Sequence, residues 1–402
     1  MYRVPTHKIR TGMKLAQTIT LDQNREYLVA GATLRESYIT LLLKHGITSV
    51  YVMSECAPDV VPQDVVKPQT RAELTDELRQ VIKEIEASFQ KAANGSLRRV
   101  YMDVDLSGIR RSIDKVIAEL TAQPTVVYNL SDIRRADEAT LGHSVNVAIL
   151  STLLGTEVGY TQAELRDLAL GALLHDVGKV TTPESILKKP GRLTREEFEI
   201  MTCHTIEGWE ILRRQRQVSP RSSIVALQHH ERWSGGGYPY SLVGEEIYRF
   251  ARICAIADCF DAMTSDRVYR PGLSSAAALK ILTASMKDHF EPSLLWSFTQ
   301  CVAPYPVGTL VELTGGVQAV VVQTIRRQAH RPKVRLVRFS SSEPVKDQIE
   351  LDLSEHPELE ISRVITEGGD TLESVDAPVS TDAAADHSSS FSVLSSSMSK
   401  GI

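Results

Sequence analysis

The feature that most constrains the fold is a long stretch of helical periodicity in the middle of the chain. Between residues 126 and 304 the apolar residues recur almost throughout at three- and four-residue spacing, which is typical of α-helices. After Pro304 and Pro306 the period changes to two, which indicates short strands. We therefore predict a mainly α protein, with an all-helical domain at residues 126–304 and a small C-terminal β segment at residues 305–370.

Two further parts precede the helical domain. Residues 1–66 combine short alternating runs with an apolar helix-like stretch from Tyr38 to His45, and this mixture predicts a small N-terminal α/β module. Residues 67–125 contain two amphipathic helices, which we interpret as a helical linker. A homodimer contact or a signal relay would explain this helix pair, and packing against the helical domain would explain it equally well.

Composition narrows the class of protein and its partners. The formal net charge is −5, so no basic excess exists to bind a nucleic acid polymer. The five cysteines form no CxxC pair, which fits a reduced cytoplasmic protein. No signal peptide is recognisable, and the longest apolar stretches, such as Leu168–Leu174, are far too short for a membrane span. Residues 371–402 are rich in Ser, Ala and Asp, so we predict a disordered tail.

Five of the eleven histidines fall between residues 143 and 230, inside or beside otherwise apolar helices. A single histidine on such a helix is usually a hydrogen-bonded core residue. Five histidines and two aspartates, all placed where predicted helices meet, fit that explanation poorly. Neutral imidazoles and carboxylates are ligands that first-row divalent metals prefer. The set comprises His143, His175, His204, His229, His230, Asp258 and Asp261.

The adjacent pair His175-Asp176 suits a site for two metal ions. One carboxylate can bridge both ions while the imidazole binds one of them. Two ions about 3.5–4 Å apart would hold the attacking and leaving oxygens of an in-line phosphoryl displacement. They would also lower the pKa of a bridging water and supply hydroxide near neutral pH. The predicted chemistry is metal-assisted phosphoester hydrolysis.

Several short segments of the helical domain occur in a recognisable order. They are His175-Asp176 with Gly178-Lys179, His229-His230-Glu231, Gly237-Tyr238-Pro239, Asp258 with Asp261-Ala262-Met263-Thr264-Ser265, and Arg267 with Arg270. This string strongly resembles the HD-GYP family, and the match runs from about His143 to Phe298. An HD pair alone recurs by chance, whereas the full string is highly specific. The first 66 residues resemble the small domain of unknown function often found before HD-GYP domains.

The resemblance implies an HD-type phosphohydrolase domain that cleaves cyclic di-GMP, or a related cyclic dinucleotide, to the linear dinucleotide pGpG. It also implies two divalent metal ions, with iron or manganese expected, and Asp176 as the bridging carboxylate. Asp261 is expected to orient a neighbouring ligand rather than to bind metal itself. The implied metal ligands are His143, His175, Asp176, His204, His229, His230 and Asp258.

Three cationic residues complete the implied active site. Lys179 would contact a scissile phosphate oxygen and stabilise the charge that grows in the transition state, and it would act in catalysis together with Asp176. Arg267 and Arg270 would bind the other phosphate or a guanine edge, where planar bidentate donors suit best. A solvated pair of charges at a helix end would also explain these two arginines.

The segment Gly235–Pro239 is predicted to be a loop, because three glycines and a proline cannot continue a helix. In the HD-GYP family the Gly237-Tyr238-Pro239 motif is associated with contacts to a protein partner. A turn packed by the side chain of Tyr238 is the alternative interpretation.

Three positions depart from the family pattern. Ser234 stands where an aspartate commonly precedes the glycines, and Thr205 follows His204 where proline is common. Ala139 stands one helical turn before His143, where members with a third metal carry a glutamate. Because an alanine side chain cannot bind a metal, we predict a two-metal site that releases mainly the linear dinucleotide.

The main hypothesis is an active phosphodiesterase, because the implied ligand set is complete. The alternative is a non-catalytic cyclic-dinucleotide sensor that signals through its flanking domains. Degenerate relatives usually lose the His-Asp pair or the paired histidines, and this chain keeps both. An HD enzyme for nucleotides such as dNTPs or guanosine tetraphosphate is a third option, which the Gly237-Tyr238-Pro239 segment and the two downstream arginines argue against.

Overall fold

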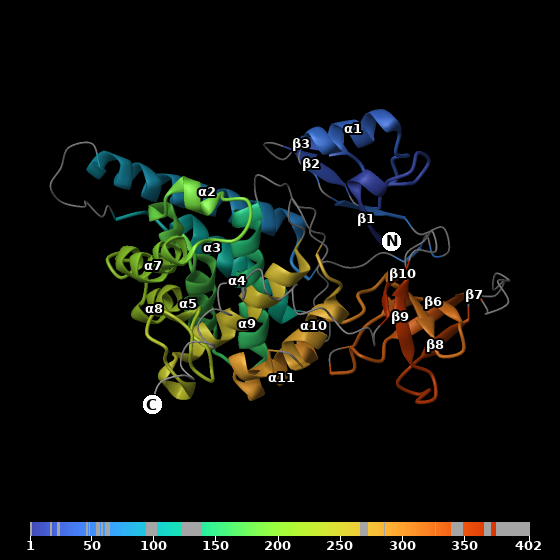
Figure 1. Ribbon diagram of the computed structural model, residues 1–402. Coiled ribbons are helices and arrows are strands. Elements are labelled where there is room, and N and C mark those ends of the chain that lie inside the picture. Colours follow the sequence, from blue (N-terminus) through green and yellow to red (C-terminus); the bar gives the residue numbers. More distant parts are fainter. Residues whose placement is uncertain are drawn as a thin grey trace.

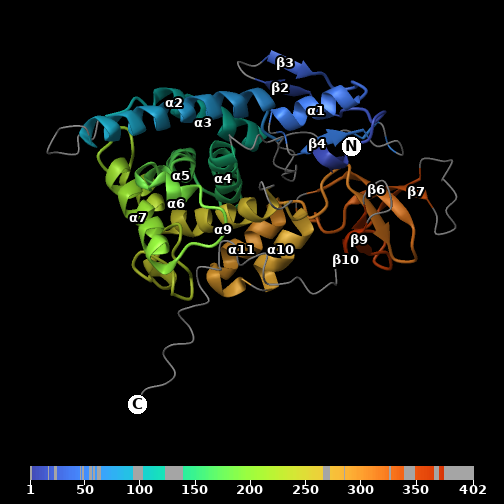
Figure 2. The same cartoon turned by 45° about the horizontal axis from the view of Figure 1, so that its top comes forward.

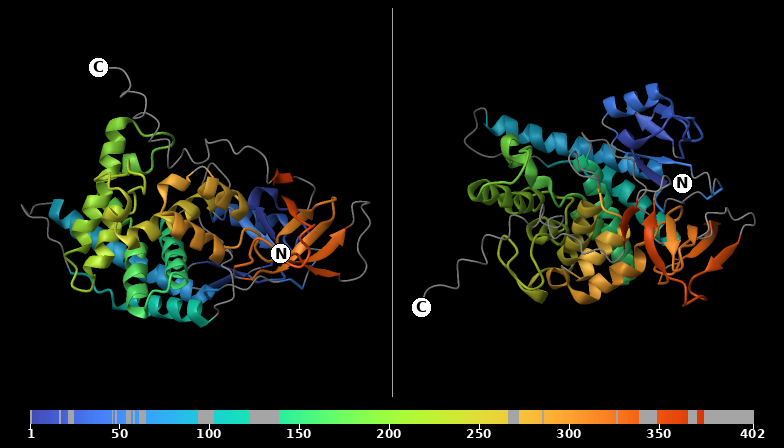
Figure 3. Two further views of the ribbon diagram at one scale, coloured as in Figure 1. Left: turned by 90° about the horizontal axis from the view of Figure 1, so that it is seen from below. Right: turned by 45° about the vertical axis from the view of Figure 1, so that its right-hand side comes forward.

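The computed structural model contains three parts, which are a mixed N-terminal module, a large helical domain and a C-terminal antiparallel sheet (Figure 1). The predicted fold class is therefore confirmed. The N-terminal module and the sheet lie next to each other, beside the helical domain (Figure 3). The described residues are 2–16, 18–21, 25–45, 47, 49–53, 57, 59–60, 65–93, 103–122, 139–265, 272–284, 286–325, 327–338, 349–365 and 371–374.

The helical domain is built from ten α-helices and three short 3-10 segments among the described residues. Helices α2 and α3 lie along one side of it, over α4 and α5 (Figure 2). Within the described part of the chain, no helix combines the length and apolar character needed to cross a bilayer. The elements are α2 (Pro68–Ala93), α3 (Ser107–Ala122), α4 (Ala139–Glu157), α5 (Gln162–Leu173), η3 (Val177–Thr181), α6 (Glu184–Leu187), α7 (Arg195–Leu212), α8 (Pro220–Gln228), η4 (Gly244–Glu246), α9 (Arg249–Thr264), α10 (Ser275–Ala284), η5 (Lys287–His289) and α11 (Pro292–Cys301).

Helix α9 is buried on nearly all sides, and α4, α5, α8, α10 and α11 contact it. A helix with apolar residues around its whole circumference is expected inside a domain. Two residues of α9, Asp258 and Asp261, are buried carboxylates. Because a buried charge is costly unless it is paired or binds a metal, both side chains require partners inside the domain.

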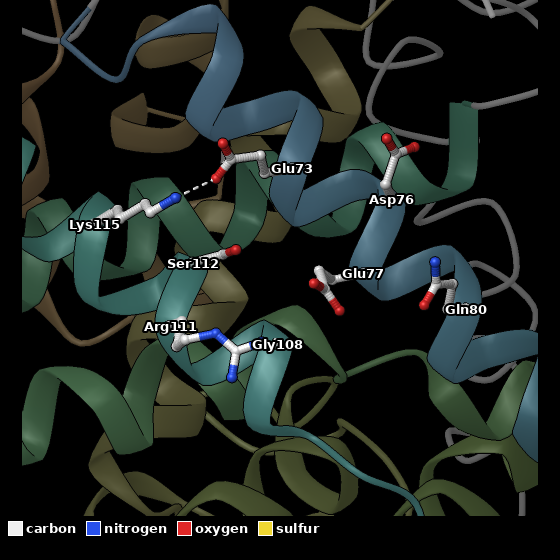
Figure 4. A pocket seen from close by; sticks show the side chains of 8 residues that line it. All are labelled: Glu73, Asp76, Glu77, Gln80, Gly108, Arg111, Ser112 and Lys115. Atoms are coloured by element: carbon white, nitrogen blue, oxygen red, sulfur yellow. Dashed lines mark hydrogen bonds and ion pairs between the residues drawn. The ribbon is translucent and has the colours of Figure 1, made fainter. Parts of the chain in front are cut away.

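Helices α2 and α3, which we predicted as a linker, share the core of the helical domain. Leu74 and Leu78 of α2 and Ile109 and Ile113 of α3 belong to the same buried cluster as the core of α4 and α9. Packing against the helical domain therefore explains their amphipathic pattern. On their outer side the two helices border an open pocket, where Lys115 Nζ lies 2.5 Å from Glu73 Oε2 (Figure 4).

The N-terminal module has two strand pairs and one helix around a small core. Strand β1 (Tyr2–Pro5) pairs antiparallel with β4 (Ser49–Val52), and β2 (Ile19–Leu21) pairs antiparallel with β3 (Arg25–Leu28). A short 3-10 segment, η1 (Thr6–Lys8), follows β1. Helix α1 (Glu36–Lys44) places Leu42 in the core with residues from all four strands.

The C-terminal segment forms a six-stranded antiparallel sheet in the order β10-β9-β5-β6-β7-β8. Residues that alternate along the strands point to two faces, and both faces are buried in hydrophobic clusters, which explains the period of two in the sequence. The strands are β5 (Leu310–Leu313), β6 (Gln318–Gln323), β7 (Lys333–Arg338), β8 (Glu350–Asp352), β9 (Ile361–Ile365) and β10 (Thr371–Ser374).

The predicted start of the disordered tail at residue 371 is wrong for the first four residues of that segment. Thr371–Ser374 form β10, which pairs with β9 at the edge of the sheet. Edge pairing needs only backbone groups, so a polar sequence can form it without burying apolar side chains. Residues 375–402 lie outside the described residues, and their disorder stays a prediction.

One face of the sheet is covered by the segment that leaves the N-terminal module. Ala57 and Val60 are buried against Leu310, Val320 and Ile365. Beside them, Arg335 Nη1 lies 2.8 Å from both carboxylate oxygens of Asp59. The stretch before α2 is therefore attached to the C-terminal sheet.

Two truncated proteins should show that strand β10 stabilises the fold and that the residues after it do not. A chain that ends at residue 370 loses the pairing with β9, and we expect its melting temperature to fall by about 2–4 °C, since a loss of about 1 kcal/mol has this effect in a large domain. A chain that ends at residue 374 should melt like the full chain. Thermal unfolding of the two truncated proteins measures the difference, and equal melting temperatures would show that β10 contributes nothing.

Candidate metal centre

The packing of five helices brings the seven predicted metal ligands together, although they are spread over more than a hundred residues of sequence. All seven lie on these helices or shortly beyond their ends. His143 lies on α4, His175 and Asp176 follow α5, His204 lies on α7, His229 and His230 follow α8, and Asp258 lies on α9.

The side chains form two neighbouring groups, and in each group the potential ligand atoms lie within 4.8 Å of one another. The rings of His175 and His229 connect the groups, with their centroids 4.9 Å apart. Each group offers enough donors for one divalent ion. The first group is Asp176, His204, His229 and His230, and the second is His143, His175 and Asp258.

Three imidazoles are fixed by backbone carbonyls of the helices that carry or precede them. A carbonyl only accepts hydrogen bonds, so each Nδ1 carries the proton and each Nε2 keeps its lone pair. Metal-binding histidines typically have this arrangement, because the bond at one nitrogen aims the other at the metal. The contacts are His175 Nδ1 to Ala172 O at 2.7 Å, His204 Nδ1 to Met201 O at 2.6 Å and His229 Nδ1 to Ala226 O at 3.0 Å.

Two atoms at the centre of the cluster, His175 Nε2 and Asp176 Oδ1, are buried without a hydrogen-bond partner. Asp176 Oδ1 faces the Nε2 atoms of His204 and His229 at 3.5 and 3.7 Å, while Oδ2 lies 3.3 Å from His175 Nε2. An unsatisfied buried acceptor costs about 1–3 kcal/mol, and a cation between these lone pairs would remove the cost. The residues therefore fit a divalent metal ion.

Burial and neighbouring charges keep most of these groups in the forms that bind metal. Burial lowers the pKa of His204 to about 3, and it also lowers the pKa values of His229 and His230. Burial works against ionisation of Asp176, but the charge of Lys179 and the contacts with His175 and His229 together outweigh it and hold the pKa of this carboxyl well below its usual range. At neutral pH these residues are neutral imidazoles and an ionised carboxylate, as metal binding requires.

His143 differs from the other histidines because it contacts two carboxylates. Its Nε2 lies 3.0 Å from Asp258 Oδ1, and its Nδ1 lies 2.7 Å from Asp261 Oδ2. Burial lowers the pKa of His143, but the two hydrogen bonds outweigh that effect and raise the pKa to about 9. A metal that binds Nε2 must therefore displace a proton from this ring.

Asp261 has the position that we predicted, beside a ligand rather than among the ligands. It also accepts a hydrogen bond of 2.9 Å from Asn146 Nδ2, and both residues are fully buried. The sequence prediction did not include Asn146. Its spacing of three residues from His143 places both side chains on one face of α4, and a buried amide in an apolar helix needs a partner. That spacing was the available signal.

Gly178 allows the His-Asp pair to approach helix α7. A Cβ atom at this position would lie 1.9 Å from the carbonyl oxygen of His204 and 2.5 Å from the backbone nitrogen of Gly208. Only a residue without a side chain fits this contact between η3 and α7. The glycine therefore sets the distance between Asp176 and His204.

Lys179 lies at the edge of the cluster. Its Nζ is 2.5 Å from Asp176 Oδ2, and its side chain is 27% exposed, whereas Asp176 is 6% exposed. The ammonium group thus contacts the buried carboxylate and is also accessible to solvent. Lys188, by contrast, is 72% exposed and pairs with Glu184 away from the cluster.

The Gly235–Pro239 loop turns Tyr238 toward the cluster. The Tyr238 ring stacks on His230, with centroids 4.6 Å apart and an interplanar angle of 29°. The buried carboxylate of Glu231 accepts backbone hydrogen bonds from Tyr240 and Leu242, which holds the loop. A turn packed by Tyr238 therefore describes this loop, while a contact with a protein partner at Gly237-Tyr238-Pro239 stays a prediction.

Two predicted site residues, Arg267 and Arg270, lie outside the described residues. Helix α4 begins at Ala139, one turn before His143. The roles of the two arginines in binding substrate therefore stay predictions.

Comparison with known proteins agrees with the fold and the cluster. A family model described as an HD domain matches residues 128–294, and a model described as a KOW domain associated with HD domain matches residues 310–369. The chain is 31% identical over 366 residues to a cyclic di-GMP phosphodiesterase of Pseudomonas aeruginosa, and the match covers 86% of this chain and 88% of that relative.

Two shorter matches each cover less than half of this chain. A cyclic di-GMP phosphodiesterase response regulator of Xanthomonas campestris is 39% identical over 168 residues, which are 40% of this chain and 44% of the relative. A 3'3'-cGAMP-specific phosphodiesterase of Vibrio cholerae is 39% identical over 172 residues, which are 42% of this chain and 33% of the relative.

The helical fold and the histidine-aspartate cluster define the class, which is that of HD-domain proteins with the ligand set for divalent metal. The match over most of the chain shows the family: the chain belongs to the HD-GYP family of cyclic-dinucleotide phosphodiesterases.

Proposed function

We propose that this protein is a metal-dependent phosphodiesterase that hydrolyses cyclic di-GMP, or a related cyclic dinucleotide, to the linear dinucleotide pGpG. The names of the relatives support this substrate class, since they include cyclic di-GMP and 3'3'-cGAMP phosphodiesterases. The observation that carries the proposal is the buried cluster in which His175 Nε2 and Asp176 Oδ1 have no hydrogen-bond partner.

Two divalent ions, for which we propose iron or manganese, would be held by the seven clustered residues. When bound, they would supply Lewis acidity toward the scissile phosphate and an activated water. Asp176 would bridge them, because its two oxygens face different histidines. The backbone carbonyls behind His175, His204 and His229 would keep the rings in place during turnover.

The other proposed roles concern the substrate and the partners of the protein. Lys179 would move its ammonium group from Asp176 toward a phosphate oxygen, a movement that its partial exposure permits. Arg267 and Arg270 would hold the second phosphate or a guanine edge. A partner at the Gly237-Tyr238-Pro239 loop, a homodimer and a cytoplasmic location stay predictions.

Turnover by the purified protein tests the proposal. The protein is prepared anaerobically, loaded with iron(II) or manganese(II), and incubated with cyclic di-GMP or 3'3'-cGAMP, and the products are identified by chromatography. We expect the linear dinucleotide to appear only with metal. Tight binding of cyclic dinucleotide without turnover, at full metal loading, would instead support the non-catalytic sensor.

Replacing Lys179 by methionine should lower the catalytic constant about a hundredfold, which is the usual loss when a charge-stabilising donor is removed. Metal content should stay unchanged, since the bound ions themselves would neutralise Asp176. Steady-state kinetics and metal analysis measure the two effects. The matched control is Lys188→Met, which removes an exposed lysine of the same region. An unaltered catalytic constant in Lys179→Met would remove this residue from the mechanism.

Metal analysis of the anaerobically purified protein should find two tightly bound ions per chain, with pGpG as the main product. In members with a third metal a glutamate occupies the position of Ala139, and a third ion without this ligand would be held mainly by water. Since the family links the third metal with the second cleavage, GMP should accumulate slowly. About three tightly bound ions, with GMP as the main early product, would contradict the prediction.

A further inference from the structure

A chain of hydrogen bonds leads from the metal centre to helix α2, on the side from which the N-terminal module enters. His143 Nδ1 lies 2.7 Å from Asp261 Oδ2, and the other oxygen of Asp261 accepts a bond of 2.9 Å from Asn146 Nδ2. Asn146 Oδ1 then accepts a bond of 2.7 Å from Arg71 Nη1. These hydrogen bonds connect helices α4, α9 and α2.

The donor or acceptor character of each residue fixes which of its atoms takes part in this series of hydrogen bonds. An ionised Asp261 can only accept, so Asn146 must present its amide nitrogen to it. The amide oxygen of Asn146 then points away from Asp261 and needs a donor, because the residue is fully buried. Arg71 supplies that donor, and a guanidinium can never become an acceptor. Arg71 and Asp261 therefore fix the orientation of the Asn146 amide from its two ends.

The start of helix α2 is itself held in place. The backbone nitrogen of Lys67 and the hydroxyl of Thr70 donate hydrogen bonds of 2.8 Å to the carboxylate of Glu119 on α3. The residues before the helix, Val65 and Val66, are buried in the core of the helical domain. A little earlier in the chain, Asp59 binds Arg335 of the C-terminal sheet. Arg71 thus projects from a segment that contacts both the helical domain and the C-terminal sheet.

We infer that Arg71 is a positioning residue for the metal centre, which fixes the ring of His143 through Asn146 and Asp261 and so makes metal affinity depend on the placement of helix α2. This inference rests on the proposed metal site. Without Arg71 the Asn146 amide loses one of the two contacts that orient it, and Asp261 then holds His143 less firmly.

The expected loss of metal affinity depends on how many residues lie between Arg71 and His143. Loss of a direct partner of a metal-binding histidine typically lowers metal affinity about 10–100-fold. Arg71 acts through two intervening residues, so we expect a loss of about threefold to tenfold, in the range reported for residues that couple distant sites.

Manganese(II) titration of the full-length protein, in competition with a chelator, tests the inference. Arg71→Met should weaken manganese binding about threefold to tenfold, and Arg71→Lys should restore part of the affinity because an ammonium also donates. The matched control is Lys115→Met, which likewise removes a cation that joins α2 to another helix. Lys115 pairs with Glu73 in the open pocket of Figure 4, and both side chains are about half exposed.

A second readout does not require metal. In protein with labelled histidine, the nitrogen chemical shifts report how the His143 ring is held, and they should change in Arg71→Met but not in Lys115→Met. The double variant Arg71→Met with Asn146→Ser should bind manganese no more weakly than Asn146→Ser alone, since both changes interrupt the same series of hydrogen bonds.

Three results would overturn the inference. These are unchanged manganese affinity in Arg71→Met, an equal loss in Lys115→Met, and additive losses in the double variant. A wild-type protein that binds no manganese or iron would contradict the proposed function itself, so the two failures can be told apart.

Discussion

Replacing Asp176 by alanine is expected to abolish turnover and to lower the metal content of the purified protein. Its two oxygens face both groups of ligands, and one of them is buried without a hydrogen-bond partner. Loss of a residue that merely supports a ligand already costs about 10–100-fold in affinity or activity, so loss of the central carboxylate should cost more than about a hundredfold. Metal analysis and a phosphodiesterase assay measure the two effects.

Thermal unfolding separates loss of metal from loss of fold. A metal that binds only the folded protein raises the melting temperature, so chelation should lower it in the wild type and leave Asp176→Ala unchanged. Asp114→Ala is the control, because its carboxylate forms an ion pair with Arg166 at the surface of the same domain. Near wild-type activity and metal content in Asp176→Ala would contradict the two-metal proposal.

The helices could be predicted because their signal is local. The four-residue spacing of Leu74 and Leu78, and of Ile109 and Ile113, reflects faces that are buried in one core. The spacing itself does not say which surface covers such a face. A dimer partner and the helical domain were therefore equally good explanations for α2 and α3 until the packing was known.

The presence of strands in the C-terminal sheet could be predicted, but the order of these strands in the sheet could not. Strands β5 to β8 pair with their neighbours along the chain, as a meander does. Strand β9 instead returns to the free edge of β5, and β10 extends the sheet beyond it. Edge pairing depends on backbone groups that every sequence has, so neither composition nor periodicity marks Thr371–Ser374 as a strand.

The candidate ligands could be predicted because their residue types are costly to bury without a purpose. The side-chain contacts that support His143 could not be predicted, because they join residues that are distant in sequence. Arg71 and Asn146 are 75 positions apart, and Asn146 and Asp261 are 115 apart. The stacking of Tyr238 on His230 likewise depends on how the loop folds back, and a sequence motif does not contain that information.

Replacing Gly178 by alanine is expected to displace η3 from helix α7 and thereby to disrupt the metal centre. The new methyl group would meet backbone atoms of His204 and Gly208, and a helix backbone cannot rotate away as a side chain can. Overpacking of this kind typically destabilises a protein by about 1–3 kcal/mol. Asp176 would also move away from His204, which lies 3.5 Å from it, so metal affinity should fall together with stability.

The neighbouring glycine provides the matched control. A Cβ atom at Gly208 would lie 3.2 Å from the backbone nitrogen of Gly178 and 3.4 Å from Ala226 Cβ, which small shifts can relieve. Both variants add one methyl group to the same contact between η3 and α7, but only Gly178→Ala forces the His-Asp pair outward. Denaturant unfolding with and without manganese(II) should therefore show a smaller loss of stability for Gly208→Ala and a metal effect close to that of the wild type. If Gly178→Ala kept wild-type metal affinity, the close approach of η3 to α7 would not be what sets the distance between Asp176 and His204.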